Sequence, residues 1–296
     1  AISLNNLASI YSLMGQYDKA ESLLIQAKEI RKKKLGENHP DYAMSLNNLA
    51  VFYKIMGQFD KAEKLYIESK EIQKNNSGKS HPEYVISLNN LACLYGDMGQ
   101  YERAEPLFIE AKEIRKKILG ENHPDYAMSL NNLATLYQDM GQFKKAEQLH
   151  IEAIEIQYRI LGKKHPDYAM SLNNLAALYK ISGLYKKSEA LYIEAKETRK
   201  NILGENHPDY ARSLNNLATL YEAMGLYKKA EPLFLSSADI IIKNLKKTFS
   251  ILSEKEKENY LVNNISLMDI NHSLLYKYKK GSSSLLIGNY NLIIFF

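Results

Sequence analysis

The sequence has few of the residues that stabilise secreted domains or anchor a protein in a membrane. It has a single cysteine, Cys93, which excludes an internal disulfide and fits a reducing compartment, so we expect a cytoplasmic protein. No stretch approaches the ~20 apolar residues that cross a bilayer, and we expect no membrane association. The chain begins without a methionine or a basic leader. We therefore expect no signal peptide and interpret the sequence as a piece of a longer protein.

Charge of one sign is confined to short clusters, such as residues 31–34, which we interpret as the ends of second helices, where cations complement the helix dipole. The net charge is +5, and the basic residues are interleaved with glutamates, as between Lys28 and Lys33. A nucleic-acid-binding surface needs its cations gathered on one face. We interpret these charges as a solvated helix surface and expect no direct binding of nucleic acid.

The chain contains an internal repeat of 42 residues. The phrase SLNNLA begins at Ser3, Ser45, Ser87, Ser129, Ser171 and Ser213. The dipeptide His-Pro keeps the same spacing, beginning at His39, His81, His123, His165 and His207. Two motifs locked in one register over five periods predict six copies of one structural unit within residues 1–240.

Each copy has the pattern of two helices. In the second copy the apolar residues recur every three or four positions, as on one stripe of a helix: Leu46, Leu49, Ala50, Tyr53 and Met56. The His39-Pro40-Asp41 sequence suits a helix start, and Gly57 suits its end. A second helix is predicted from about Asp60, closing at residues 75–78.

A single hairpin cannot bury its own apolar stripe, so the copies are expected to stack on one another. Small residues recur where two helices should cross. On the first helices they are Ala8, Ala50, Ala92, Ala134, Ala176 and Ala218. On the second helices they are Ala20, Ala62, Ala104, Ala146 and Ala230, with Ser188 in the fifth copy.

These residues resemble the tetratricopeptide repeat (TPR). In the first copy the matching residues are Leu4, Asn6, Leu7, Ala8, Tyr11, Gly15, Tyr17, Ala20 and Ala27. The 42-residue length and the LGENHPDYA connection at residues 35–43, 119–127 and 203–211 are similar to the kinesin light chain subtype. The resemblance implies an all-α, right-handed solenoid of about six hairpins whose first helices line a concave groove that binds protein or peptide.

Every first helix carries a pair of asparagines, although asparagine is a mediocre helix former. The pairs, here without the first copy's Asn5 and Asn6, are Asn47 and Asn48, Asn89 and Asn90, Asn131 and Asn132, Asn173 and Asn174, and Asn215 and Asn216. One interpretation is a ladder of amides that binds the backbone of an extended peptide. The other is that one asparagine of each pair fixes the stacking register. The resemblance favours peptide contact, and we expect the first of each pair to lie nearer the groove.

Other residues at helical spacing from the asparagines predict a mixed groove surface with few charges. They are Met44, Val51, Ile55, Ile86, Cys93, Asp97, Met128, Thr135, Asp139, Met170, Ala177, Ile181, Arg212 and Thr219. Such a surface suits an apolar or backbone-read peptide better than a carboxylate, which would need lysine and arginine. Lys54 and Lys180 could also point inward.

The candidate chemical residues have simpler structural interpretations. The loop histidines are a whole hairpin apart, too far to share an ion, and are expected to order helix starts. His150 stands where other copies have an aromatic core residue, and Cys93 stands where other copies have a small packing residue. The sequence contains no glycine-rich phosphate loop. We therefore expect no catalysis, cofactor or metal in this chain, and any protease activity would lie beyond residue 296.

The repeat register ends near residue 240, and residues 241–296 are predicted to form a helical cap or connector. The last second helix should extend through 240–245, followed by helices from Glu254 past Leu261 and over 270–278. The stretch FSILSEKEKENYL (249–261) resembles the connector that precedes CHAT domains, which are caspase-like proteases. That resemblance implies that the chain is the recognition part of a larger protein.

The hypothesis from sequence is an interaction scaffold that binds an extended protein segment through its asparagines. Two alternatives stay open at this point. The chain could be a self-assembling scaffold without a dedicated peptide ligand, and its oligomeric state is open. It could also be the non-catalytic part of an enzyme whose site is shared across an interface.

Overall fold

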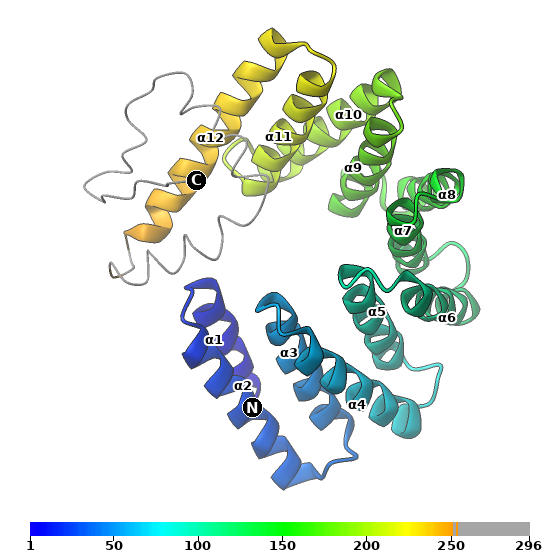
Figure 1. Ribbon diagram of the computed structural model, residues 1–296, viewed down its shortest axis with the longest axis vertical. Helices are drawn as coiled ribbons and strands as arrows, with labels where there is room; N and C mark the ends of the chain where they lie inside the picture. Colours follow the sequence, from blue (N-terminus) through cyan, green and yellow to red (C-terminus); the bar gives the residue numbers. More distant parts are fainter. Residues whose placement is uncertain (251–252, 254–296) are drawn as a thin grey trace. The chain divides into compact units, whose positions relative to one another are not determined.

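The computed structural model describes residues 1–250 and 253, which form twelve α-helices and no strands (Figure 1). The helices are α1 (Ile2–Leu13), α2 (Tyr17–Leu35), α3 (Pro40–Ile55), α4 (Phe59–Ser77), α5 (Pro82–Asp97), α6 (Tyr101–Leu119), α7 (Pro124–Asp139), α8 (Phe143–Leu161), α9 (Pro166–Ile181), α10 (Tyr185–Leu203), α11 (Pro208–Ala223) and α12 (Tyr227–Phe249). In this part of the chain no helix combines the length and apolarity needed to span a membrane. The helices predicted after residue 253, and most of the CHAT-like stretch, lie outside the described residues.

The helices pair into six hairpins, each with an odd-numbered first helix and an even-numbered second helix. They belong to two compact units, Ala1–Ile160 and Leu161–Phe296. In the first unit α2 packs on α3, α4 on α5 and α6 on α7, and in the second α10 packs on α11. The all-α helical-repeat solenoid predicted from sequence is thus confirmed. The predicted domain boundary at residue 240 stays a prediction, and α12 continues through it to Phe249, as the predicted extension requires.

The His-Pro dipeptides start the first helices as predicted. Proline occupies the first helical position, where its missing N–H has no partner to lose. The imidazole Nδ1 of His39 accepts a hydrogen bond from the backbone N–H of Asp41 at 3.1 Å. The same bond recurs at His81, His123, His165 and His207. Each loop histidine therefore orders a helix start.

Glycine closes the first helices because the backbone turns into the left-handed region there. Gly57 has φ +68°, and a Cβ placed on it would meet nothing within 4 Å. Conformation rather than crowding therefore requires glycine at this turn. The turn lets the N–H of Gln58 donate to the carbonyl oxygen of Tyr53 at 2.8 Å, which places the second helix directly beside the first.

The predicted crossing positions form the centre of the core. Every alanine named for the first and second helices is at most 1% exposed, and Ser188 is fully buried. The hydroxyl of Ser188 donates to the carbonyl oxygen of Ala176 at 2.7 Å, which satisfies the one polar group in that series. Small side chains thus allow the helix backbones to approach closely.

Two tyrosines on each of α3, α5 and α7 fix the position of the helix between second helices. On α5, the Tyr84 hydroxyl donates to Glu110 on α6 at 3.0 Å, within the same hairpin. The Tyr95 hydroxyl donates to Glu63 on α4 at 2.9 Å, in the preceding hairpin. Equivalent pairs recur at intervals of 42 residues, for example from Tyr137 to Glu105. These bonds align the two helices within each hairpin, and they also align each hairpin with the preceding one.

We expect Ala134→Leu to lower the free energy of unfolding by about 1–3 kcal/mol, because a larger side chain must displace closely packed neighbours. Urea denaturation of the purified chain measures this change. Thr135→Leu places the same side chain at the neighbouring exposed position and should change stability by less than about 0.5 kcal/mol. Equal losses for the two variants would contradict the close crossing at Ala134.

Candidate partner-binding face

Most of the residues that sequence analysis assigned to the groove lie on exposed sides of the first helices, whereas the first asparagines of the pairs lie deeper. We define the first-helix face of the first unit as the partly or fully exposed residues Met44, Asn48, Val51, Lys54, Ile55, Ile86, Asn90, Cys93, Gly96, Asp97, Met128, Asn132, Thr135 and Asp139. Ile55 is 64% exposed on this face, an unusual position for an aliphatic residue. In the second unit the equivalent residue, Ile181, is 57% exposed. Both units therefore present apolar side chains beside asparagines.

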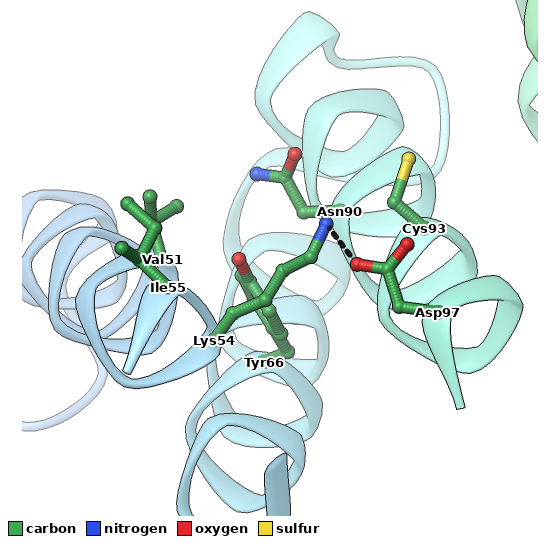
Figure 2. A pocket seen from close by; sticks show the side chains of 7 residues that line it. All are labelled: Val51, Lys54, Ile55, Tyr66, Asn90, Cys93 and Asp97. Carbon is green, nitrogen blue, oxygen red and sulfur yellow. Dashed lines mark ion pairs between the residues drawn. The ribbon is translucent and has the colours of Figure 1, made fainter. Parts of the chain in front are cut away.

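A pocket of about 370 Å³ lies on this face between α3 and α5 (Figure 2). Val51 and Ile55 of α3 stand on one side, and Cys93 and Asp97 of α5 stand on the other. The ammonium of Lys54 crosses between them to the Asp97 carboxylate, with an Nζ–Oδ2 distance of 2.8 Å. We call this the α3–α5 pocket, and its lining is Val51, Lys54, Ile55, Tyr66, Asn90, Cys93 and Asp97.

The Cys93 thiol and the Tyr66 phenol, which line the α3–α5 pocket, stay protonated at neutral pH. Burial raises the pKa of the Cys93 thiol, and Lys54 offsets only part of that rise. Burial likewise raises the pKa of Tyr66, and the neighbouring Cys93 and Asp97 add to the rise. A protonated thiol is a poor nucleophile, so Cys93 serves here as a small lining residue. The charge of the pocket resides in the ion pair of Lys54 and Asp97.

The paired asparagines link neighbouring hairpins. The amide nitrogen of Asn90 donates to the Asn47 oxygen at 2.8 Å, and Asn132 donates to Asn89 at 3.3 Å. In the second unit Asn216 donates to Asn173 at 2.6 Å. In each case the second asparagine of one pair bonds the first asparagine of the preceding pair. One amide of each bonded pair thus helps to fix the stacking register, as one of the two interpretations from sequence proposed.

The two asparagines of a pair differ in exposure. The first ones are the deeper set: Asn89, Asn131 and Asn215 are buried, and Asn47 and Asn173 are half-buried. The second ones, Asn48, Asn90, Asn132, Asn174 and Asn216, are all half-buried. We expected the first asparagine of each pair to lie nearer the groove, but the first asparagines are on the whole more deeply buried than the second ones. The reason is local, since the first asparagines turn toward buried groups such as the Val85 carbonyl, which Asn89 contacts at 2.9 Å.

His150 on α8 is the buried neighbour of Asn131. It is fully buried at the position held by Phe108 and Tyr66 in other copies, which confirms the core role predicted for it. Its Nδ1 lies 2.8 Å from the Asn131 oxygen, while its buried Nε2 has no hydrogen-bond partner among the described residues. Burial lowers the pKa of His150 to about 4, so the imidazole is neutral at pH 7.

Sequence reasoning missed the pairing of Lys54 with Asp97 and the place of Tyr66 in the pocket. Lys54 and Asp97 were considered separately, and Tyr66 was not considered as a groove residue. A signal was present, because Lys54 and Asp97 are 43 residues apart, the same offset that joins Asn47 to Asn90. Residues with this offset lie side by side on consecutive first helices.

The repeats identify the family. The tetratricopeptide repeat family matches residues 1–66, 43–117, 94–159, 129–186 and 167–243. The chain belongs to the tetratricopeptide repeat family. Such repeats indicate a protein–protein interaction scaffold, so the partner of this TPR chain is a protein. No curated protein matches the sequence.

The solved structures similar to this TPR chain include kinesin-light-chain-like proteins. The nearly identical TPR-like repeats of a Podosopora anserina protein assigned as a kinesin light chain share 29% identity, with a TM-score of 0.58. That match covers 70% of this chain and 98% of the other. BtubC (BKLC) from P. vanneervenii shares 23% identity over 78% of this chain and 89% of the other, with a TM-score of 0.60, and supports the fold alone.

We expect His150 to make stability depend on pH. Its pKa is lowered to about 4 in the folded chain, against about 6.5 when unfolded, so the unfolded chain binds the extra proton between these values. The neutral imidazole makes its whole contribution to the free energy of unfolding above about pH 6.5. That contribution falls by roughly 3 kcal/mol as the pH is lowered to 4. His150→Phe should remove that part of the acid loss, which urea denaturation at pH 7 and pH 4 would measure. Identical acid losses in both proteins would contradict the buried neutral histidine.

Proposed function

We propose that this TPR chain binds an extended segment of a partner protein along the first helices. The observation that carries the proposal is the α3–α5 pocket, which places an apolar wall, an amide and an ion pair around one cavity of about 370 Å³. A ligand pocket of this size holds a large side chain, and its few polar groups orient the ligand. In the proposed complex Val51 and Ile55 contact an apolar side chain of the segment.

The asparagine amides would bind the backbone of the same segment. Asn90 uses one amide hydrogen to reach Asn47, and its oxygen has no hydrogen-bond donor among the described residues. The oxygen and the second hydrogen form the acceptor and donor that an extended backbone needs. In this proposal the second asparagines, Asn48, Asn90, Asn132, Asn174 and Asn216, contact the ligand. The first asparagines, Asn47, Asn89, Asn131, Asn173 and Asn215, hold the helices that present them.

In the intact protein this chain would be the recognition part of a larger assembly. The sequence of 249–261, with its resemblance to the connector before CHAT proteases, supports an effector domain that partner binding recruits or releases. The single, half-buried thiol of Cys93 supports action in a reducing compartment such as the cytoplasm.

Binding and stability should separate between the two sets of asparagines. We expect the triple variant Asn48→Ala, Asn90→Ala and Asn132→Ala to lose partner protein that the parent chain retains from a lysate of its own source. Its melting temperature should fall only modestly, because the variant loses the bonds from Asn90 to Asn47 and from Asn132 to Asn89 but keeps the buried contacts of the first asparagines. Co-purification with quantitative mass spectrometry and thermal denaturation by circular dichroism are the two measurements.

The matched control is Asn47→Ala, Asn89→Ala and Asn131→Ala, which removes three amides from the deeper set and leaves His150 without its contact. This variant should lose clearly more thermal stability than the first. If the variant of Asn48, Asn90 and Asn132 remains folded and retains every partner of the parent chain, these asparagines have only a structural role. The binding proposal then fails for this face.

A further inference from the structure

The pairing of Lys54 with Asp97 has a counterpart one hairpin further along, in which the cation is missing. The offset of 43 residues that joins Lys54 to Asp97 also joins Gly96 to Asp139. The bonds from Asn90 to Asn47 and from Asn132 to Asn89 show that α5 and α7 stack in the same register as α3 and α5. Gly96 therefore occupies the place from which a cation would reach Asp139.

Nothing in the local structure requires glycine at residue 96. It lies within α5, where glycine is the least favourable residue apart from proline. Its φ is not in the left-handed region, and a Cβ placed on it would meet nothing within 4 Å. Neither backbone conformation nor close packing explains this residue. What the glycine provides is open space on the first-helix face beside Asp139.

Asp139 is an exposed carboxylate without a countercharge. It forms no ion pair or hydrogen bond with its carboxylate among residues 1–250 and 253, whereas Asp97 is paired with Lys54 at 2.8 Å. Partial burial raises the pKa of Asp139, and the neighbouring Asp97 raises it further. A cation placed beside Asp139 would relieve this repulsion, and an anion would increase it.

We propose that the space over Gly96 receives a lysine or arginine side chain of the bound partner segment, which pairs with Asp139. This inference rests on the proposed function, since the segment must lie along the first-helix face. Val51 and Ile55 define an apolar subsite between α3 and α5, and Gly96 with Asp139 defines an anionic subsite between α5 and α7. Neighbouring packed helices are about 10 Å apart, which an extended chain covers in about three residues. The preferred segment therefore has an apolar residue and a basic residue about three positions apart.

The test is selection from a display library of random 12-residue peptides, carried out on the full chain and on three variants. We expect the parent chain and Gly96→Ala to enrich peptides with this apolar and basic spacing. Asp139→Asn removes the charge, and Gly96→Lys supplies an internal cation that competes for Asp139, so both should lose the preference for the basic residue. Gly96→Ala is the matched control, because it fills the helix position without adding a charge.

The strongest parent peptide, labelled with fluorescein, is then measured by fluorescence anisotropy. Its binding should weaken about fivefold on Asp139→Asn, the scale of a partly exposed charge pair. The difference should shrink as salt is added, because exposed charges are screened. Circular dichroism checks that each variant is folded. If Gly96→Lys does not fold, the result for Asp139→Asn, a substitution at an exposed position, decides whether the anionic subsite exists.

The outcomes separate this inference from the proposed function. If the parent enriches peptides that lack a basic preference, or if Asp139→Asn enriches the same basic peptides equally, the anionic subsite is wrong while peptide binding stands. If the parent enriches acidic peptides, the charge assignment is wrong. If the parent enriches no peptide at all, the proposed function fails on this face and the subsite falls with it.

Discussion

The structure depends on the fact that one helical hairpin cannot bury its own apolar stripe. Each first helix must therefore be held between its own second helix and the preceding one. Tyr84 and Tyr95, near the two ends of α5, do this by donating to Glu110 of α6 and Glu63 of α4. An inserted residue would rotate the following part of a helix by about 100° and break such bonds. The spacing of these residues within each helix is thus a structural requirement.

The same requirement determines which surface is left for a partner. Side chains of a first helix that face the second helices are committed to packing, so only its remaining side can meet a ligand. Asparagine fits the boundary between these two regions because its amide bonds a neighbouring helix with one atom and offers another to a ligand. The bond from Asn90 to Asn47 at the edge of the α3–α5 pocket is of this kind. Register and recognition are therefore not alternatives for such a residue.

Periodicity made most of the fold predictable from sequence. The helix starts at His-Pro, the glycine turns, the crossing alanines and the core role of His150 all follow from comparing copies, because residues in equivalent positions meet equivalent neighbours. The candidate site was less predictable. The depth of Asn89 depends on the rotation of α5 about its axis, which packing sets and the 42-residue spacing does not reveal. Lys54 and Asp97 lie on separate hairpins. Their pairing can be predicted only once it is known that residues 43 positions apart lie side by side on consecutive first helices.

In a repeat protein, selectivity must come from positions where the copies differ. Residues that recur from copy to copy, such as the tyrosines and the crossing alanines, repeat one structural interaction and cannot distinguish one part of the chain from another. Along the first-helix face of the first unit, exposed Ile55 is followed at equivalent positions by Asp97 and then by Asp139. The position one residue earlier changes from Lys54 to Gly96, so Asp97 is paired within the chain, whereas Asp139 is the acid that we propose pairs with a partner. In that proposal the repeated scaffold has a direction, apolar at one end of this face and anionic at the other, which sets one orientation for the partner segment.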